Sequence, residues 1–158
     1  MPGNVSRGAV QLTYHTDYAL RLLIYLVARP GQTVGTREIA EHYGISPDHL
    51  IKVAKSLTRA GWLVSSRGVG GGVRLAERTP STPIGDIVRH TENTPLVECF
   101  HLETNTCPIH RGCHLRSILH QAHQAFFDVL DSFTVSDLAK NPGSLASPLG
   151  KKPRRTRS

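Results

Sequence analysis

A chain of 158 residues is long enough for one domain, or for a small domain with an appended helix, and it can bury an ordinary core. Its hydrophobic share of 39%, with no apolar run near the roughly 20 residues of a membrane span, argues against a membrane protein, and the lack of a secretory signal leads us to expect a cytoplasmic one. The formal net charge is +7 and is unevenly placed. Residues 11–80 hold nine Lys and Arg against five Asp and Glu, whereas residues 81–150 hold four against seven. We therefore expect only the first half to face a polyanion such as DNA.

The N-terminal half has the pattern of a helix-turn-helix. Residues 1–10 lack periodicity and are expected to form a flexible N-terminal extension. Apolar residues then recur at helical spacing from residue 16 to a Pro-Gly pair that ends the helix. Thr36 is expected to cap a second helix, and a Ser-Pro pair opens a third over residues 46 to about 60. A short helix, a turn with glycine and a helix with a polar outer face predict this DNA-binding motif.

The next segment changes to the period of a β-hairpin. Residues 62–64 and 73–75 read as two strands, and the glycine-rich residues 67–72 read as the tip. A phosphate-binding loop is less favoured, because the glycines lack a GKS/T signature and a capped helix after them. Two strands after a helix-turn-helix form a wing, so residues 11–80 predict a winged helix-turn-helix DNA-binding domain.

Polar and basic side chains at the start of the second helix, on the third helix and on the wing are the candidates for DNA contact. They can donate to phosphates or base edges, and an arginine at the wing tip can enter a minor groove. For any single one of them, a solvated surface charge is the alternative. The candidate residues are Thr36, Ser46, His49, Lys52, Lys55, Ser56, Arg59 and Arg67.

The C-terminal half predicts a short helix, an irregular segment and a long helix. The short helix, from residue 84 to about 90, and the segment after it make up region 81–114. In region 115–140, a long helix with an apolar stripe precedes a final turn, and we expect the stripe to pack on a second copy of the chain as a dimerisation helix. The stripe consists of Leu115, Ile118, Leu119, Ala122, Phe126, Leu130 and Phe133. Residues 141–158 are expected to form a disordered basic tail.

Three cysteines, Cys99, Cys107 and Cys113, lie within the irregular segment. Their odd number and the lack of an export signal favour metal or redox chemistry over disulfides. Their spacing is too wide for zinc knuckles and ribbons, whereas three thiolates suit an iron–sulfur cluster. One ligand is then missing, and the local candidates are His101, His110, His114, Glu98 and Glu103.

Three other interpretations of the cysteines remain open. They can be free structural residues, or they can hold a single zinc ion in a zinc-stabilised DNA-binding protein. A redox or metal enzyme is the third, but the chain offers no paired carboxylates or catalytic triad, so we expect no enzyme activity.

Over residues 11–142 the chain resembles a known family, the winged-helix iron–sulfur transcription repressors of the IscR, NsrR and RirA types. The resemblance rests on QLTYHTDYALR at 11–21, the helix-turn-helix, RGVGGGVRL at 67–75, IGDIVR at 84–89, the three cysteines, CHLRSIL at 113–119 and SFTVSDLAKNP at 132–142. It is closest to the nitric-oxide sensors of the NsrR type.

The resemblance implies a homodimeric repressor on a palindromic double-stranded operator, released when nitric oxide attacks its cluster. It implies a 4Fe–4S cluster, or a 2Fe–2S cluster, on the three cysteines, with Asp17 of the partner subunit as the further ligand. An aspartate in the first turn of a helix also has a simple alternative role, because it meets the helix dipole favourably. The ligand histidine of the IscR type is replaced by Arg116, and the gap between the first two cysteines is longer than usual. A sensor of iron or cluster status remains the alternative regulator.

Overall fold

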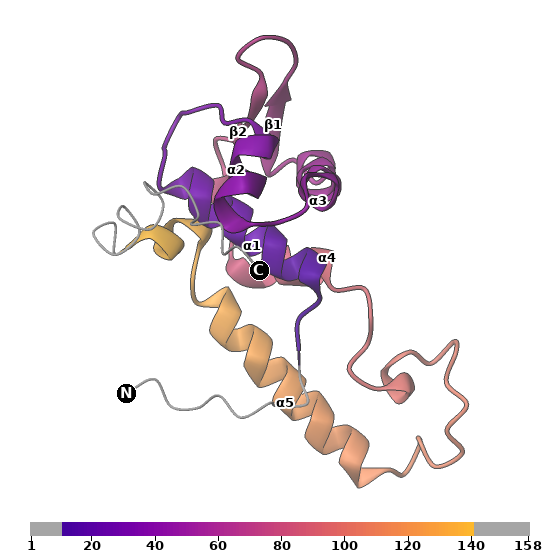
Figure 1. Cartoon of the computed structure of the whole chain (residues 1–158). Coiled ribbons are helices and arrows are strands. Elements are labelled where there is room, and N and C mark those ends of the chain that lie inside the picture. The colour runs from indigo at the N-terminus through magenta and orange to yellow at the C-terminus, as the bar shows by residue number, and fades with distance from the viewer. Residues whose placement is uncertain (1–10, 141–158) are drawn as a thin grey trace, which may run out of the picture.

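The computed structural model describes residues 11–140, so the expected flexible extension at 1–10 and the disordered basic tail at 141–158 lie outside the described residues. Its N-terminal helices form a compact group with a two-stranded sheet projecting at one end, and one long helix extends from this group (Figure 1). In chain order they are α1 (Tyr14–Val27), α2 (Thr36–Tyr43), α3 (Pro47–Arg59), β1 (Leu63–Ser66), β2 (Gly72–Leu75), the 3-10 helix η1 (Thr79–Ser81), α4 (Ile84–Thr91), η2 (Glu98–Phe100), α5 (His114–Asp131) and η3 (Val135–Ala139). The predicted fold class, mainly helical with a small β-wing, is confirmed.

Helix α1 forms the centre of the core. Leu22, Leu23 and Leu26 are at most 1% exposed, and they lie on the face that contacts α3, α4 and η3. The helix begins earlier than the periodicity predicts, because the side chain of Thr13 accepts a hydrogen bond from the Thr16 N–H and caps the first turn.

Helices α2 and α3 form the predicted helix-turn-helix, joined at Gly44, which has φ of +66°. The prediction that Thr36 caps α2 is wrong. Gly35 occupies the N-cap, and Thr36 is the first helical residue. The reason is the isolated β-bridge between Val34 and Val73, which keeps the chain extended up to Gly35.

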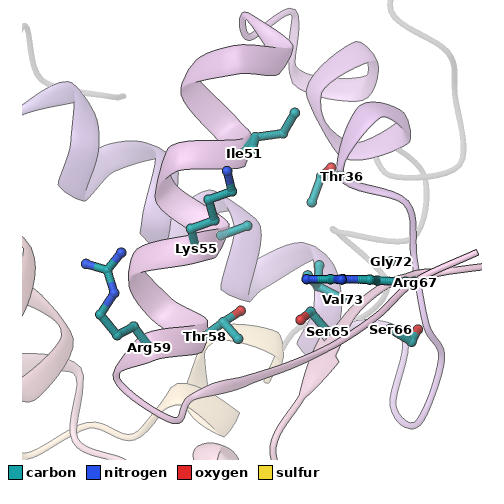
Figure 2. Close-up of a pocket in the computed structure, with 11 residues that line it drawn as sticks. Thr36, Ile51, Lys55, Thr58, Arg59, Ser65, Ser66, Arg67, Gly72 and Val73 are labelled. Carbon is teal, nitrogen blue, oxygen red and sulfur yellow. The ribbon is translucent and has the colours of Figure 1, made fainter.

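The wing is an antiparallel hairpin that lies beside α3 (Figure 2). Leu63 pairs with Leu75 at its base. The first strand starts one residue later than predicted, at Leu63, because the Trp62 N–H donates to the Leu57 carbonyl of α3 at 3.0 Å instead of to the opposite strand.

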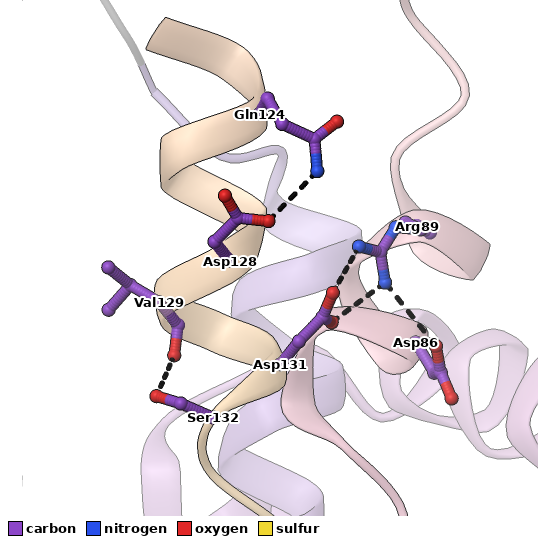
Figure 3. Close-up of polar contacts among 7 residues, drawn as sticks. All are labelled: Asp86, Arg89, Gln124, Asp128, Val129, Asp131 and Ser132. Carbon is purple, nitrogen blue, oxygen red and sulfur yellow. Dashed lines mark hydrogen bonds and ion pairs between the residues drawn. The ribbon is translucent and has the colours of Figure 1, made fainter. Parts of the chain in front are cut away.

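Helix α5 is attached to the core at its C-terminal end. Phe127, 7% exposed, packs with Ile84 and Val88 of α4 in a small separate cluster. Above this cluster the guanidinium of Arg89 donates to both carboxylate oxygens of Asp131, at 2.6 and 2.8 Å (Figure 3). Phe127 is the only buried residue of α5, although it lies outside the apolar stripe predicted for this helix.

Among residues 11–140, no helix combines the length and the apolar character required to cross a lipid bilayer.

Candidate functional site

A groove of about 490 Å³ separates α3 from the wing. Its walls come from the start of α2, the outer face of α3 and both strands (Figure 2). The lining residues are Thr36, Ile51, Ala54, Lys55, Thr58, Arg59, Ser65, Ser66, Arg67, Gly72 and Val73. Three of these are cationic, several carry hydroxyl donors and none is acidic, so the groove is suited to a polyanion.

The structure brings only part of the expected DNA-binding set to this groove, which Thr36, Lys55, Arg59 and Arg67 line. Ser46 is exposed at the N-cap of α3, outside the residues that line it.

The remaining candidates lie on other sides of α3. His49 and Lys52 line a second hollow, of about 210 Å³, with Tyr14, His15 and Tyr18 of α1. Ser56 faces α4, because its hydroxyl lies 3.2 Å from Nε2 of His90 and shares a hydrogen bond with it.

Sequence reasoning missed Ile51, Thr58, Ser65 and Ser66 as groove residues. The spacing of 51, 55 and 58 was a usable signal, since residues three or four apart share a helix face. Ile51 was missed because an apolar residue in an amphipathic helix is normally assigned to the core.

The three cysteines lie on the connection between α4 and α5. All are free and half-buried, and Cys113 is the N-cap of α5. Within residues 11–140 no group of three or more His, Cys, Asp or Glu side chains is close enough to hold a metal ion. The fold therefore gathers the cysteines on one segment without converging their side chains.

Contacts with α5 hold the start of this connection. The backbone carbonyl of Cys99 accepts a hydrogen bond from Nε of Arg116 at 3.1 Å. The ring of the next residue, Phe100, lies edge-on to His120 and His123, with centroids 5.8 and 5.9 Å apart. Cys99 is thereby tied through its own backbone and its neighbour to the first half of α5.

A second set of hydrogen bonds closes the loop between the first two cysteines. Oε1 of Glu98 accepts the backbone N–H and the hydroxyl of Thr106, each at 2.7 Å. These bonds lower the pKa of Glu98, the hydroxyl contributing more than the N–H. Glu98 directly precedes Cys99, and Thr106 directly precedes Cys107. This contact therefore closes the loop between the two cysteines.

The donor chemistry of the connection fits an iron–sulfur cluster. Three unpaired thiols are soft ligands of the type that such clusters require. Among the local candidates for a further ligand, His110 is half-buried, with Nδ1 2.8 Å from the Cys107 carbonyl oxygen. The other four, Glu98, His101, Glu103 and His114, are exposed.

Asp17 lies away from the cysteines, in the first turn of α1. Its Oδ2 is 2.7 Å from Nη2 of Arg21, and its side chain is 40% exposed. The carboxylate is therefore ion-paired within its own subunit but still accessible from outside.

Residues 12–141 match the model of a family described as Rrf2, iron-dependent transcriptional regulator. The chain belongs to the Rrf2 family. The cysteines, the helix-turn-helix and the wing of this Rrf2 protein all lie within the matched region. The family assignment confirms a DNA-binding transcriptional regulator rather than an enzyme.

Similar proteins support the same assignment. The Rrf2 chain is 43% identical over 138 residues to the HTH-type transcriptional regulator NsrR of Shouchella clausii, a match that covers 86% of this chain and 93% of that protein. It is 44% identical to NsrR of Bacillus subtilis over 84% of this chain and 92% of that one. Among solved structures, Staphylococcus aureus CymR is similar, with a TM-score of 0.64, 28% identity and coverage of 81% and 97%.

Proposed function

We propose that this chain is a homodimeric repressor whose affinity for a palindromic operator depends on an iron–sulfur cluster and is abolished by nitric oxide. The single observation that carries the proposal is the position of Cys99, Cys107 and Cys113. These free thiols lie together on the segment that connects the winged helix-turn-helix to α5. The similarity to NsrR regulators over most of the chain supports the same assignment.

The DNA side of the proposal uses α3 and the wing. Lys55, Arg59 and Arg67 would neutralise phosphates along the groove, and the hydroxyl of Thr36 at the start of α2 would donate to a phosphate there. His49 and Lys52 would contact DNA at the flank of α3. Ser46 would contact DNA at the N-terminus of α3. Ser56 would have to break its hydrogen bond with His90 before it could contact DNA.

The cluster side uses the three cysteines, with Asp17 of the partner subunit as the further ligand. When bound, the cluster, 4Fe–4S or 2Fe–2S, supplies iron that reacts with nitric oxide. To bind the cluster, Asp17 would have to break its ion pair with Arg21. A carboxylate is a harder, more weakly held ligand of iron than a thiolate. The hydrogen bond of Glu98 to Thr106 and that of Arg116 on α5 to the Cys99 carbonyl would hold the chain around Cys99 in place.

The exposed face of α5 would form the dimer contact. Leu115, Ile118 and Val129 are 60%, 48% and 60% exposed in the single chain, an arrangement that favours burial against a second copy. A dimer would place two α3 helices on the two half-sites of the operator.

The test is an absorption spectrum with iron and sulfide analysis on anaerobically purified protein, followed by operator binding during titration with nitric oxide. We expect a bound cluster, and stoichiometric loss of binding as nitric oxide is added. Parallel titrations with oxygen and with an iron chelator separate this function from sensing of iron or cluster status. Colourless protein with stoichiometric zinc that binds its operator normally would refute the cluster and leave the zinc-stabilised alternative.

Variants assign the ligands. Replacing any one cysteine by serine should abolish nitric-oxide-sensitive binding, whereas Asp17→Ala should destabilise the cluster without removing the thiolates. An unchanged cluster spectrum and lifetime in Asp17→Ala would remove Asp17 from the ligand set.

A further inference from the structure

Helix α3 exposes one large aliphatic side chain. Ile51 is 37% exposed, whereas Leu50, Val53 and Leu57 on the same helix are at most 1% exposed. A single exposed aliphatic residue is common on protein surfaces, so exposure alone assigns it no role. What distinguishes Ile51 is its surroundings.

Ile51 lines the groove between α3 and the wing. It lies one helical turn before Lys55, and both side chains are on the side of α3 that faces Thr36 (Figure 2). Arg59 and Arg67 also line the groove, and no acidic residue does. A second copy of this cationic surface would be repelled, whereas a polyanion that also offers a small apolar group would match it.

Double-stranded DNA offers one such group in its major groove. The C5-methyl of thymine is the apolar contact on the base edges, and side chains of the N-terminal part of a recognition helix are those that reach these edges. Ile51 lies in the N-terminal half of α3. We infer that Ile51 reads the C5-methyl of one thymine in each half-site, and is thus a specificity-determining residue of this regulator.

The inference rests on the proposed DNA-binding surface and assigns to it a base that phosphate contacts cannot select. Lys55, Arg59 and Arg67 attract any sequence, because phosphates are the same throughout the duplex. Burying one methyl group against Ile51 favours thymine over a pyrimidine that lacks it.

The experiment compares thymine with deoxyuridine, which lacks only the C5-methyl. Anaerobically purified protein first selects its binding sequence from a random pool of duplex DNA. Each thymine of the selected sequence is then replaced singly by deoxyuridine, and affinities are measured for the wild type, Ile51→Ala and Ile51→Val. Val64→Ala is the matched control, since Val64 is 39% exposed on β1 but does not line the groove.

For the wild type we expect one thymine per half-site at which the replacement weakens binding about fourfold, as the burial of one methyl predicts, and about 15-fold when both half-sites are changed. Ile51→Ala should bind the thymine sequence more weakly and lose sensitivity to deoxyuridine at that position. Ile51→Val should keep part of the sensitivity to deoxyuridine, and Val64→Ala should behave as the wild type.

Two results would overturn the inference, provided that thermal unfolding shows the variants to be folded. One is a selected sequence in which no deoxyuridine weakens wild-type binding. The other is a deoxyuridine effect that persists undiminished in Ile51→Ala. Selection of no sequence at all is a separate outcome, because it would refute the proposed operator binding and this inference with it.

Discussion

At the scale of single residues, the candidate metal centre depends on side chains that are not themselves soft ligands. Glu98 joins the two ends of the loop between the first cysteines through Thr106, and Arg116 ties the Cys99 carbonyl to α5. Outer residues of this kind orient metal ligands, and their loss commonly weakens a site without removing any donor.

We predict that Glu98→Ala shortens the lifetime of the bound cluster by about tenfold, because Thr106 loses its acceptor and the Cys99–Cys107 loop opens. The lifetime is measured from the decay of cluster absorbance after anaerobic addition of a chelator. Glu98→Gln keeps an acceptor oxygen and should restore most of the lifetime, and Thr104→Ala, on an exposed residue of the same loop, should have no effect. Equal lifetimes in Glu98→Ala and the wild type would contradict the positioning role.

The attachment of the wing to the segment before α2 depends on the small size of Gly72. A Cβ at Gly72 would overlap the backbone carbonyl of Val34, which cannot move without breaking the bridge to Val73. Gly72→Ala should therefore lower the free energy of unfolding by about 1–3 kcal/mol and weaken DNA binding. Chemical denaturation of the cluster-free protein is the measurement. Gly112→Ala is the control, since a Cβ there meets nothing within 4 Å, and it should leave stability unchanged.

At the scale of elements, the short helix η3 returns the chain to the core after α5. Val135 is fully buried, and the N–H of Val135 donates to the Thr82 carbonyl at 2.9 Å. A capping box starts the helix, in which the side chain of Asp137 accepts the Thr134 N–H at 2.7 Å. The stability of this element therefore depends on an ionised carboxylate.

The cap makes η3 sensitive to acid. Hydrogen bonds from Lys140, and then from the backbone and side chain of Thr134, lower the pKa of Asp137 from 3.8 to about 2. Because the folded value lies below the unfolded one, the stabilisation is complete above about pH 4 and is lost as the pH falls toward 2. Asp137→Asn should be less stable than the wild type at neutral pH, and the difference should shrink over this interval. A constant difference between denaturation curves from pH 7 to 2 would exclude this role.

At the scale of the whole molecule, α5 is the feature that a single subunit does not explain. Apart from Phe127 its apolar residues are at least partly exposed, and the connection that carries the cysteines ends at its first turn. Burial of this face against a second copy would join the cluster segment to the dimer contact. Loss of the cluster would then weaken DNA binding at both half-sites.

We predict that Ile118→Glu converts the dimer to a monomer, weakening association by at least about 100-fold, because the variant buries an unpaired charge in the contact. Sedimentation velocity measures the change. The monomer should keep its helical circular dichroism, since Ile118 is 48% exposed in the single chain. Gln121→Glu places the same charge on an exposed polar position of α5 and should leave the association unchanged. A monomeric wild type would contradict the proposed contact.

Local pattern was sufficient for most of the fold. Helical spacing, the glycine at 44 and the glycine-rich hairpin tip each depend on neighbours along the chain, and these determined the helix-turn-helix and the wing. The three cysteines on one segment and the basic character of the third helix and the wing tip were likewise visible from residue type and order. The ligand set itself stays a prediction.

Only the tertiary structure decided which side chains share a surface. It placed Gly35 rather than Thr36 at the cap, because a bridge to the distant Val73 fixes the chain there. It directed Ser56 toward His90 and brought Ile51 to the groove. Periodicity divides a helix into a buried and an exposed face, but it does not state what the exposed face meets. That depends on contacts between segments far apart in the sequence, and such contacts leave no periodic signal.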